Sequence, residues 1–360
     1  MTAQTSNAQT IAIAGAGLIG LSCGFELAQR GHDVTLFDPA TAQASAGWAA
    51  AGMIAPAYEW MLQADNPDDA FASFCFESSD LWGDFAARVE AATGQRIGYS
   101  PRPTAALART PQEDERLAKL RAYLVQLGRP AQILSPKALE LDYGLAPGLR
   151  GGLRLMDDHQ VDNRRLIAAL RSFFVSQQRL IAMPVSSRAD IETASGRSFD
   201  AVVWARGSEE TGINKRVKGQ AISLSPIAGQ PGSVLRFGPR YIVPKADRTI
   251  VGATSESEYS SDSIEPDIAR SLLAEAASVL PVLSRANILE HWAGFRPLGQ
   301  GERPVIGALG DGAFIATAHY RNGVLLAPAT ARLIADQIEG HSFPQAYRGF
   351  APRQGSGATA

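Results

Sequence analysis

A strand–turn–helix–strand pattern near the start of the chain constrains its fold more than any other feature. Apolar residues at 10–15 predict a strand, the letters GAGLIG at 15–20 predict a tight glycine turn, and a helix is expected over 18–30. A second strand at 33–37 leads directly into an acid, Asp38. This order is typical of a dinucleotide-binding βαβ unit. An ordinary glycine-rich loop would lack the flanking strands, helix and acid, so we set that alternative aside.

Each glycine of this unit, and the acid that follows its second strand, has a physical role. Gly15 permits the tight turn, Gly17 lets the backbone approach a pyrophosphate, and Gly20 lets the helix pack against the strand. Free N–H groups at the helix N-terminus favour the diphosphate, and Asp38 is placed to bind a ribose hydroxyl. The sequence therefore predicts an α/β protein with a Rossmann-type domain.

Composition limits the other possibilities. The 360 residues suffice for two domains, and 45% hydrophobic with 19% charged residues describes a globular protein. A net charge of −2 gives no electrostatic case for nucleic acid. With only Cys23 and Cys75 we expect no disulfide framework, no metal site and a cytoplasmic location. The apolar stretch 11–25 is too short to span a bilayer, so no membrane span is expected.

The remaining pattern predicts a second, discontinuous α+β domain. Helices are expected at 70–93, 112–127, 135–141, 163–178, 266–279 and 324–338, the last with Pro328 in its first turn, and strands at 152–156, 199–204, 220–224, 233–237, 240–243, 249–253, 288–292 and 313–317. The run of strands after 220 predicts a mainly antiparallel sheet. We expect a dinucleotide domain built from 1–87, 150–212 and 300–348, a substrate domain from 88–149 and 213–299, and a flexible tail at 349–360.

Four stretches together carry a family resemblance. They are GAGLIG with its acid, AAAGM at 49–53, YIVP and VGAT between 241 and 254, and a C-terminal block containing HWAGFRP at 291–297, PVIG at 304–307 and HYRNGVLLAPAT at 319–330. In this order they resemble the flavin-dependent D-amino-acid oxidase superfamily and, within it, the glycine oxidases of thiamine biosynthesis. The resemblance spans about Ile11 to Ile338.

The resemblance implies noncovalent FAD, because the C-terminal half has no cysteine for the covalent attachment that some relatives use. It implies cofactor contacts at the glycine turn, the acid, the small-residue run, one position beside the adenine, and the C-terminal block: Gly15, Gly17, Leu18, Ile19, Gly20, Asp38, Ala46, Gly47, Ala51, Gly52, Met53, Val185, His319, Tyr320, Arg321, Asn322, Gly323, Val324 and Leu325.

Three residues are the candidates for binding the substrate. Arg296 can hold an α-carboxylate through two parallel hydrogen bonds, and Tyr241 can donate a third. Arg321 is expected near the substrate entrance or the flavin edge. Taken alone, a surface ion pair and a core tyrosine would be the simpler interpretations, and the family motifs favour the substrate roles. His319 is not expected to act as a general base.

The expected reaction is oxidative deamination of glycine or another small amino acid or amine to an oxoacid, ammonia and hydrogen peroxide. Oxygen is the expected acceptor, thiamine biosynthesis the expected destination, and a homo-oligomer a possible assembly. The alternatives are a D-amino-acid or sarcosine oxidase or dehydrogenase, a tRNA-modifying flavoprotein, which the net charge disfavours, and a flavin-binding protein without turnover. Arg206 is expected either in solvent or on the cofactor phosphates, and Ser255 leaves the pocket size open.

Overall fold

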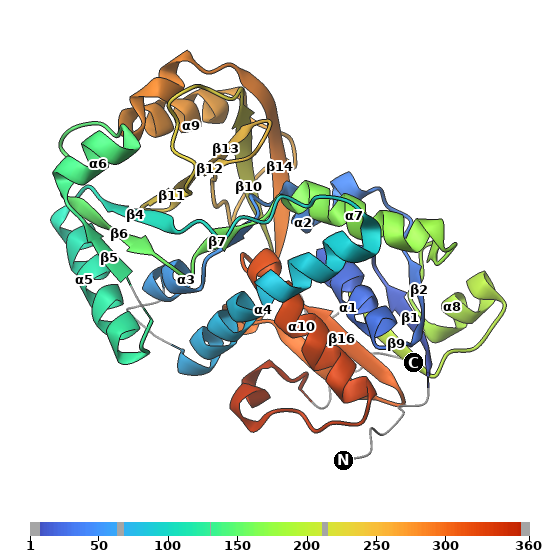
Figure 1. Cartoon of the computed structure of the whole chain (residues 1–360). Coiled ribbons are helices and arrows are strands. Elements are labelled where there is room, and N and C mark those ends of the chain that lie inside the picture. Colours follow the sequence, from blue (N-terminus) through green and yellow to red (C-terminus); the bar gives the residue numbers. More distant parts are fainter. Residues whose placement is uncertain (1–7, 63–67, 130, 211–214, 354–360) are drawn as a thin grey trace.

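Two large sheets organise the molecule. The computed structural model describes residues 8–62, 68–129, 131–210 and 215–353. A six-stranded sheet has the order β15-β16-β9-β1-β2-β8, an eight-stranded sheet has the order β14-β10-β13-β12-β11-β4-β6-β5, and β3 and β7 form a small ribbon. The two large sheets occupy opposite halves of the molecule, with the long strand β14 running from one half toward the other (Figure 1). The expected fold class, a Rossmann-type domain with a mainly antiparallel second sheet, is confirmed.

The strands of the described chain are β1 (Thr10–Ala14), β2 (Asp33–Phe37), β3 (Met53–Ile54), β4 (Thr104–Ala108), β5 (Ala131–Leu134), β6 (Gly151–Leu155), β7 (His159–Gln160), β8 (Leu180–Ile181), β9 (Ala201–Trp204), β10 (Lys215–Leu224), β11 (Leu235–Phe237), β12 (Arg240–Pro244), β13 (Thr249–Gly252), β14 (Ile288–Leu298), β15 (Val305–Gly310) and β16 (Ala313–Thr317). The α-helices are α1 (Leu18–Gln29), α2 (Ala46–Ala49), α3 (Pro56–Leu62), α4 (Asp69–Thr93), α5 (Pro111–Gln126), α6 (Pro136–Tyr143), α7 (Asn163–Ser176), α8 (Arg188–Ser195), α9 (Pro266–Val279) and α10 (Gly323–Ile338).

The six-stranded sheet is parallel except for the pair β15–β16. Ile11 and Ile13 on one face join the large core formed with α1, α4, α7 and α10. Ala12 and Ala14 on the other face pack with Ile191 of α8. Because both faces are covered, β1 is apolar and buried from Ile11 to Ala14, as a buried parallel strand requires.

The glycine turn closes this sheet against α1. Gly15 has a φ of +104°, and a Cβ there would overlap the carbonyl oxygen of Ala205. A Cβ on Gly20 would overlap the carbonyl oxygen of Gly15. Both positions therefore require glycine, the first for its backbone angle and the second for the close approach of α1 to the turn.

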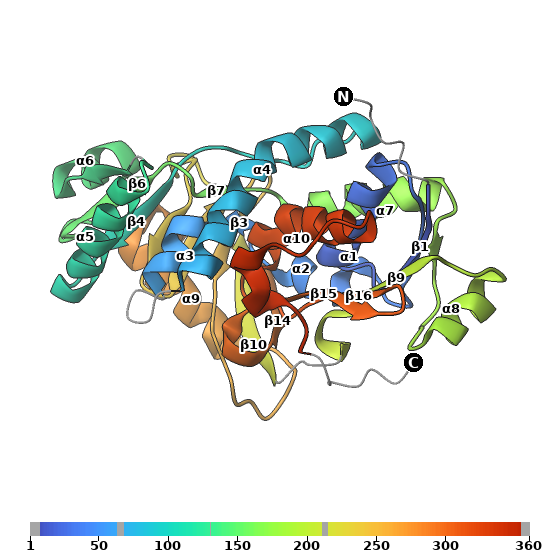
Figure 2. The ribbon, with the colours of Figure 1, turned by 90° about the horizontal axis from the view of Figure 1, so that it is seen from below.

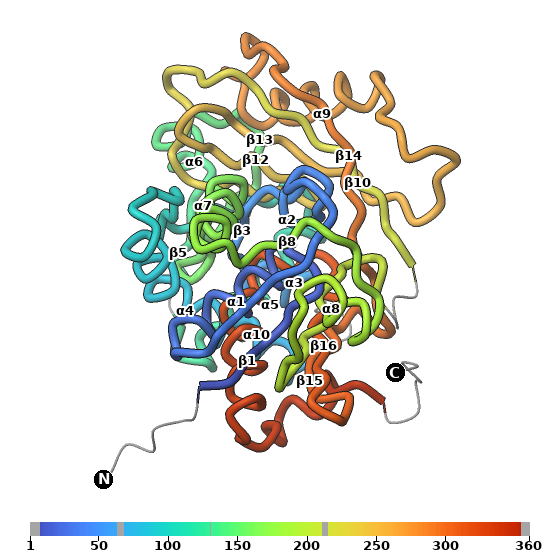
Figure 3. Tube along the Cα trace, turned by 90° about the vertical axis from the view of Figure 1, so that its right-hand side faces the viewer, coloured from blue at the N-terminus to red at the C-terminus, as the bar shows by residue number. Residues whose placement is uncertain are grey.

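The eight-stranded sheet is antiparallel except for the pair β11–β4. One face carries Ile222, Ile242 and Val251, which pack with α6 and α9. At the β4–β6 end, the opposite face packs against α3 and α5. At the β10–β14 end that face is covered by α2 and the segment after it, and Figure 3 shows α2 between β10, β14 and α1.

Some expected boundaries differ from the structure. β6 pairs with β4 and β5 in the second sheet, although the block 150–212 was expected in the dinucleotide domain. α4 continues to Thr93, beyond the expected border at 87. In the expected tail, Phe350 is buried against Phe71 and Phe74, whereas residues 354–360 lie outside the described chain. The division into domains stays a prediction.

α10 departs from expectation at Pro328, which lies inside the helix and not in its first turn. α4 runs alongside α10 (Figure 2) and supplies polar groups at this point. Ser78 Oγ donates to the carbonyl of Leu325 at 2.7 Å and accepts from the N–H of Ala329 at 3.3 Å. Trp82 Nε1 also donates to the Leu325 carbonyl, at 3.0 Å. The neighbouring helix thus satisfies backbone groups beside the proline.

No helix in the described ranges is both long enough and apolar enough to cross a membrane.

Candidate active site

The site begins with three glycines on one face of the eight-stranded sheet, which we call the glycine floor: Gly219, Gly252 and Gly294. Gly219 pairs with Gly294, and Gly252 pairs with Tyr241. Paired residues in neighbouring strands, and residues two apart along a strand, point to the same face. Arg296 and Tyr241 therefore share the face of the glycine floor, which lacks side chains of its own.

Arg296 leans over this floor. A Cβ on Gly219 would lie only 2.5 Å from Arg296 Nη1. The guanidinium donates to the carbonyls of Lys218 at 3.5 Å and Thr254 at 3.2 Å. Within the described chain it forms no ion pair, so its charge faces no protein carboxylate. Such a half-buried cation with only neutral partners is suited to a ligand's carboxylate.

Tyr241 leans over the floor from β12. A Cβ on Gly252 would lie 2.5 Å from the phenol oxygen. Burial raises the pKa of Tyr241, and this outweighs the opposing effect of the Arg296 charge. The phenol therefore stays protonated at neutral pH and can donate a hydrogen bond toward the same space as the Arg296 guanidinium.

The segment 49–53 forms the wall opposite the floor. Trp292 Nε1 donates to the Ala49 carbonyl at 2.9 Å, and a Cβ on Gly294 would overlap that of Ala49. Beyond this contact lies a pocket whose lining comes from the wall, α3, β11 and the start of α10: Ala50, Ala51, Gly52, Met53, Ala55, Glu59, Arg236, Arg321, Asn322, Val324 and Leu325. Seven residues expected at the cofactor thus share one pocket: Ala51, Gly52, Met53, Arg321, Asn322, Val324 and Leu325.

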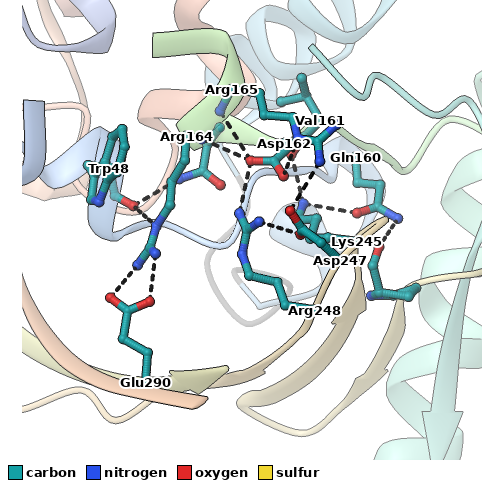
Figure 4. Close-up of polar contacts among 12 residues, drawn as sticks. Trp48, Gln160, Val161, Asp162, Arg164, Arg165, Lys245, Asp247, Arg248 and Glu290 are labelled. Carbon is teal, nitrogen blue, oxygen red and sulfur yellow. Dashed lines mark hydrogen bonds and ion pairs between the residues drawn. The ribbon is translucent and has the colours of Figure 1, made fainter. Parts of the chain in front are cut away.

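Polar contacts from α7 and from Lys245, the residue after β12, hold the chain beside the wall, and Figure 4 shows those around Trp48 and Lys245. Asn163 Nδ2 donates to the carbonyls of Gly47 at 2.8 Å and Trp48 at 3.0 Å. Lys245 Nζ donates to Gln160 Oε1 at 2.9 Å and to the Val161 carbonyl at 2.7 Å. Burial lowers the pKa of Lys245 to about 7. Val161 N–H donates to the Gly52 carbonyl at 2.8 Å. Lys245 therefore contacts a residue that is itself hydrogen-bonded to the wall.

Arg164 links the wall to β14 in the same network. Its guanidinium pairs with both carboxylate oxygens of Glu290, at 2.6 and 3.0 Å (Figure 4). It lies 5.4 Å from the ring centre of Trp48 and 4.7 Å from that of Trp292. Arg164 of α7 therefore links the half of the molecule that contains the six-stranded sheet to β14, the strand that carries Arg296.

The N-terminus of α10 borders the pocket. In the part of the chain that the structure describes, no hydrogen bond engages the N–H groups of Gly323, Val324 and Leu325. Together with the helix dipole, these groups favour negative charge at this end. Arg321 Nη2 lies 3.3 Å from Glu59 Oε2, and this carboxylate raises the pKa of Arg321. Arg321 also lies over the ring of Tyr320, at 5.3 Å.

His319 lies behind the pocket, with no place in its lining. Its Nε2 is 3.0 Å from Thr330 Oγ1. Burial lowers the pKa of His319 to about 3. The imidazole is neutral at physiological pH and engaged with a hydroxyl, and its exclusion as general base stays a prediction.

The nucleotide end of the site lies at the glycine turn. A Cβ on Gly17 would have no neighbour closer than Ser45 Cβ at 3.8 Å, so space lies above this turn. A Cβ on Gly47 would lie 2.8 Å from Leu18 Cβ, which places Gly47 beside Leu18 at the start of α1. Asp38 follows β2 and accepts from the N–H groups of Ala16 at 2.6 Å and Ala40 at 2.7 Å.

These residues fit FAD. The open space at Gly17, the start of α1 and the adjacent acid suit a diphosphate and ribose. The pocket at α10 is lined by residues that the family resemblance assigns to the cofactor. Val185, expected beside the adenine, is buried in one cluster with Ala14 and Phe37. The individual cofactor contacts stay predictions.

Two questions that the sequence leaves open concern Arg206 and Ser255. Arg206 does not point freely to solvent: it pairs with buried Glu210 at 3.0 Å and lies 5.2 Å from the Trp204 ring. Ser255 is exposed and follows Thr254, whose carbonyl accepts from Arg296. A carboxylate four residues along the chain pairs with the Arg206 guanidinium, and the expected alternative, a contact with the cofactor phosphates, stays a prediction.

The comparison with protein families now decides the class. Residues 10–337 match the DAO model, described as FAD dependent oxidoreductase. The chain belongs to this family. It is therefore an FAD-dependent oxidoreductase, and the expected resemblance and cofactor are confirmed.

Individual relatives agree with this assignment. The chain is similar to the glycine oxidase of Geobacillus kaustophilus, with 30% identity over 91% of this chain and 92% of that protein. The crystal structure of that enzyme has a TM-score of 0.83 at 29% identity, covering 96% of this chain and 98% of the other. The chain is also 34% identical to the bifunctional protein ThiO/ThiG of a Nostoc species over 91% of its own length, but spans only 52% of that protein.

Sequence reasoning missed the two other charged residues of the pocket, Arg236 and Glu59. Arg236 lies in a strand, β11, whose other residues are apolar and buried. A charged residue in such a strand was the available signal, since an arginine is rarely buried without a purpose. Glu59 gave no comparable signal, because an acid in the first turn of a helix such as α3 is common.

Proposed function

We propose that this enzyme oxidises glycine or another small amino acid or amine to the oxoacid and ammonia, with oxygen as acceptor and hydrogen peroxide as second product. The observation that carries the proposal is the pair Arg296 and Tyr241, which lean together over the glycine floor. The guanidinium there faces no described carboxylate, so a substrate's carboxylate is the partner that the site lacks. The similarity to glycine oxidases supports the same substrate class.

Arg296 and Tyr241 position the substrate in this proposal. Two parallel hydrogen bonds from Arg296 fix the plane of the carboxylate, and the Tyr241 phenol donates to one of its oxygens. FAD, when bound, supplies the hydride acceptor for the substrate Cα. The N–H groups at the start of α10 offer positive potential to negative charge that builds up in the pocket. Positioning, and not a protein base, supplies most of the acceleration.

Residues around this pair keep its geometry. Arg164 and Lys245 hold the wall, and burial keeps His319 neutral. A cytoplasmic location and delivery of the product to thiamine biosynthesis belong to the same proposal, and the sequence motifs support them.

Anaerobic spectroscopy tests the proposal. Glycine, sarcosine and D-alanine are added in turn to the FAD-loaded protein, and the flavin absorbance near its visible maximum is followed. Bleaching by at least one of them, and peroxide formation when air is admitted, are the expected results. The identity of the best substrate separates glycine oxidase from D-amino-acid or sarcosine oxidase. Bleaching that only a dye or quinone reverses would indicate a dehydrogenase.

Replacement of Arg296 tests the carboxylate role. In Arg296→Gln we expect the apparent KM for the best substrate to rise by about ten- to a hundred-fold, the loss of a charge-assisted contact of roughly 1.5–3 kcal/mol. The control is Arg154→Gln. Arg154 lies in β6 of the same sheet and donates to the Tyr143 hydroxyl and to Gln132 Oε1. Unchanged substrate kinetics in Arg296→Gln would remove Arg296 from the site.

A further inference from the structure

Arg236 is a buried cation without a carboxylate partner. It is only 3% exposed and lines the pocket together with Met53, Glu59 and Arg321. Nη1 lies 3.4 Å from Met53 Sδ, and the guanidinium carbon lies 3.8 Å from the centre of the Tyr58 ring. Nε has no hydrogen-bond partner among the described residues. A buried charge contacted only by a thioether and a ring is costly unless a ligand compensates it.

Neighbouring carboxylates do not account for Arg236. Glu59 contacts Arg321, and no ion pair joins either Glu59 or Asp158 to Arg236 in the described chain. Asp158 accepts from the N–H groups of Ala57 at 2.9 Å and Tyr58 at 3.1 Å. Burial raises the pKa of Asp158 to about 7, and the charge of nearby Arg236 opposes this rise. Arg236 therefore has no hydrogen-bonded carboxylate partner among the described residues.

The register of the sheet places Arg236 in the substrate site. Arg236 pairs with Tyr241 across β11 and β12, so both side chains rise from the face of the glycine floor. The Arg296 guanidinium lies over Gly219 of β10, three strands from β11 in the order β10-β13-β12-β11. At about 4.8 Å a strand, roughly 14 Å separates these two strands. A ligand held by both guanidinium groups therefore needs two acidic groups joined by several carbons.

We infer that Arg236 determines specificity by binding a second acidic group of the substrate, so that the site prefers small amino acids carrying a second carboxylate. This inference rests on the proposed function, because it takes Arg296 and Tyr241 as the contacts of the α-carboxylate. Arg236 then supplies the far end of the same site, and Tyr241 lies between the two guanidinium groups along the sheet.

Matched ligands test this assignment without turnover. Glutarate and valerate have the same number of carbons and differ in the second carboxylate. Each is titrated into the FAD-loaded protein, and the change in flavin absorbance gives its Kd. In the natural protein we expect glutarate to bind at least ten-fold more tightly than valerate, the usual effect of one charge-assisted contact.

Variants assign the preference to one residue. In Arg236→Gln and in Arg236→Met, which keeps packing on Tyr58, the ratio of the two Kd values should fall to about 1–2. Arg154 of β6 also lies over a tyrosine ring, at 5.9 Å from the centre of Tyr143, and Arg154→Gln should keep the ratio of the natural protein. In Arg296→Gln both ligands should bind more weakly.

Each outcome has a defined meaning. Equal Kd values in the natural protein, or a ratio that survives both Arg236 substitutions, would overturn the inference whether or not a variant is stable. Loss of flavin on gel filtration with an unchanged ratio would also overturn it, because it would assign Arg236 to the cofactor. A glutarate preference in a protein whose flavin no amino acid reduces would refute the proposed function and leave the second anion site standing.

Discussion

At the scale of single residues, the glycine floor sets how far Arg296 and Tyr241 can lean over the sheet. Gly219 and Gly252 have no side chains, and their places are taken by the guanidinium and the phenol of other strands. Glycine inside a strand usually weakens it, so its presence at these paired positions indicates a close approach by other groups. The positions of the Arg296 and Tyr241 side chains thus depend on the absence of side chains at Gly219 and Gly252.

Gly219→Ala should displace Arg296 while leaving the residue itself unchanged. A Cβ at 219 would lie 2.5 Å from Arg296 Nη1, so the guanidinium must move. We expect carboxylate ligands to bind about ten-fold more weakly, as judged by titration of the flavin absorbance. The control is Gly83→Ala in α4, where the nearest atom would be 4.0 Å away. Equal affinities for Gly219→Ala and the natural protein would show that Arg296 does not lie over β10.

His319 predicts a specific dependence of stability on pH. Its pKa in the folded protein is about 3, well below the ordinary value of 6.5, so the unfolded chain binds a proton that the folded chain refuses. As pH falls below 6.5, the free energy of unfolding should therefore fall, by up to about 1.4 kcal/mol for each pH unit from this group. Urea unfolding at pH 7.5, 6 and 5 should show a smaller loss in His319→Gln. Identical losses would contradict a neutral, buried imidazole.

Sequence reasoning found the polar residues of the site where a motif surrounded them. Arg296 and Tyr241 stand in HWAGFRP and YIVP, and the structure puts both on the glycine floor. Arg236 stands in no such motif. Its inferred role in binding a second acidic group follows from its pairing with Tyr241 across β11 and β12, which a local sequence pattern does not reveal. The Arg206–Glu210 pair is local, since its residues lie four apart, but no motif of the site surrounds it.

At the scale of elements, α10 combines a pocket-facing N-terminus with an internal proline. The helix tolerates Pro328 because α4 supplies Ser78 and Trp82 to the backbone of the affected turn. A proline inside a helix normally costs about 3 kcal/mol or more through the lost hydrogen bond and steric conflict. Contacts from α4 offset part of that cost and hold the start of α10 beside the pocket.

Ser78→Ala should expose this dependence. The buried Ser78 hydroxyl bridges the Leu325 carbonyl and the Ala329 N–H, so its removal leaves the Ala329 N–H without this acceptor. We expect the free energy of unfolding to fall by about 1–3 kcal/mol in chemical denaturation. Ser278→Ala in α9, where an exposed hydroxyl donates to the Glu275 carbonyl, should stay within about 0.5 kcal/mol. Similar values for the two variants would refute the bridging role.

Amphipathic helices were predictable from the sequence and several strands were not. The predicted range 266–279 coincides with α9, whose buried residues recur at helical spacing. β4 reads TAALA, with almost no β-branched residues, and is a strand because β11 and β6 pair with it. β15 contains glycines and pairs with β16. Such strands depend on partners distant in sequence, so propensity alone does not identify them.

At the scale of the whole molecule, the site forms where the two sheets face each other through the segment 49–53. The glycine floor comes from the eight-stranded sheet, whereas the glycine turn belongs to the six-stranded sheet and α10 packs against it. Arg164, with Glu290 on β14, ties the halves together beside the wall. The proposed function thus assigns the nucleotide to one half of the molecule and the substrate carboxylate to the other. Catalysis in this proposal requires the two halves to keep their relative position.

A crystal structure of the FAD-loaded protein with a small carboxylate such as glycolate tests this account most directly. The account predicts both carboxylate oxygens at about 2.7–3.2 Å from the Arg296 guanidinium, one of them also bonded to Tyr241 Oη, and the flavin ring beside the start of α10. A carboxylate bound elsewhere, with Arg296 still donating only to the Lys218 and Thr254 carbonyls, would contradict it.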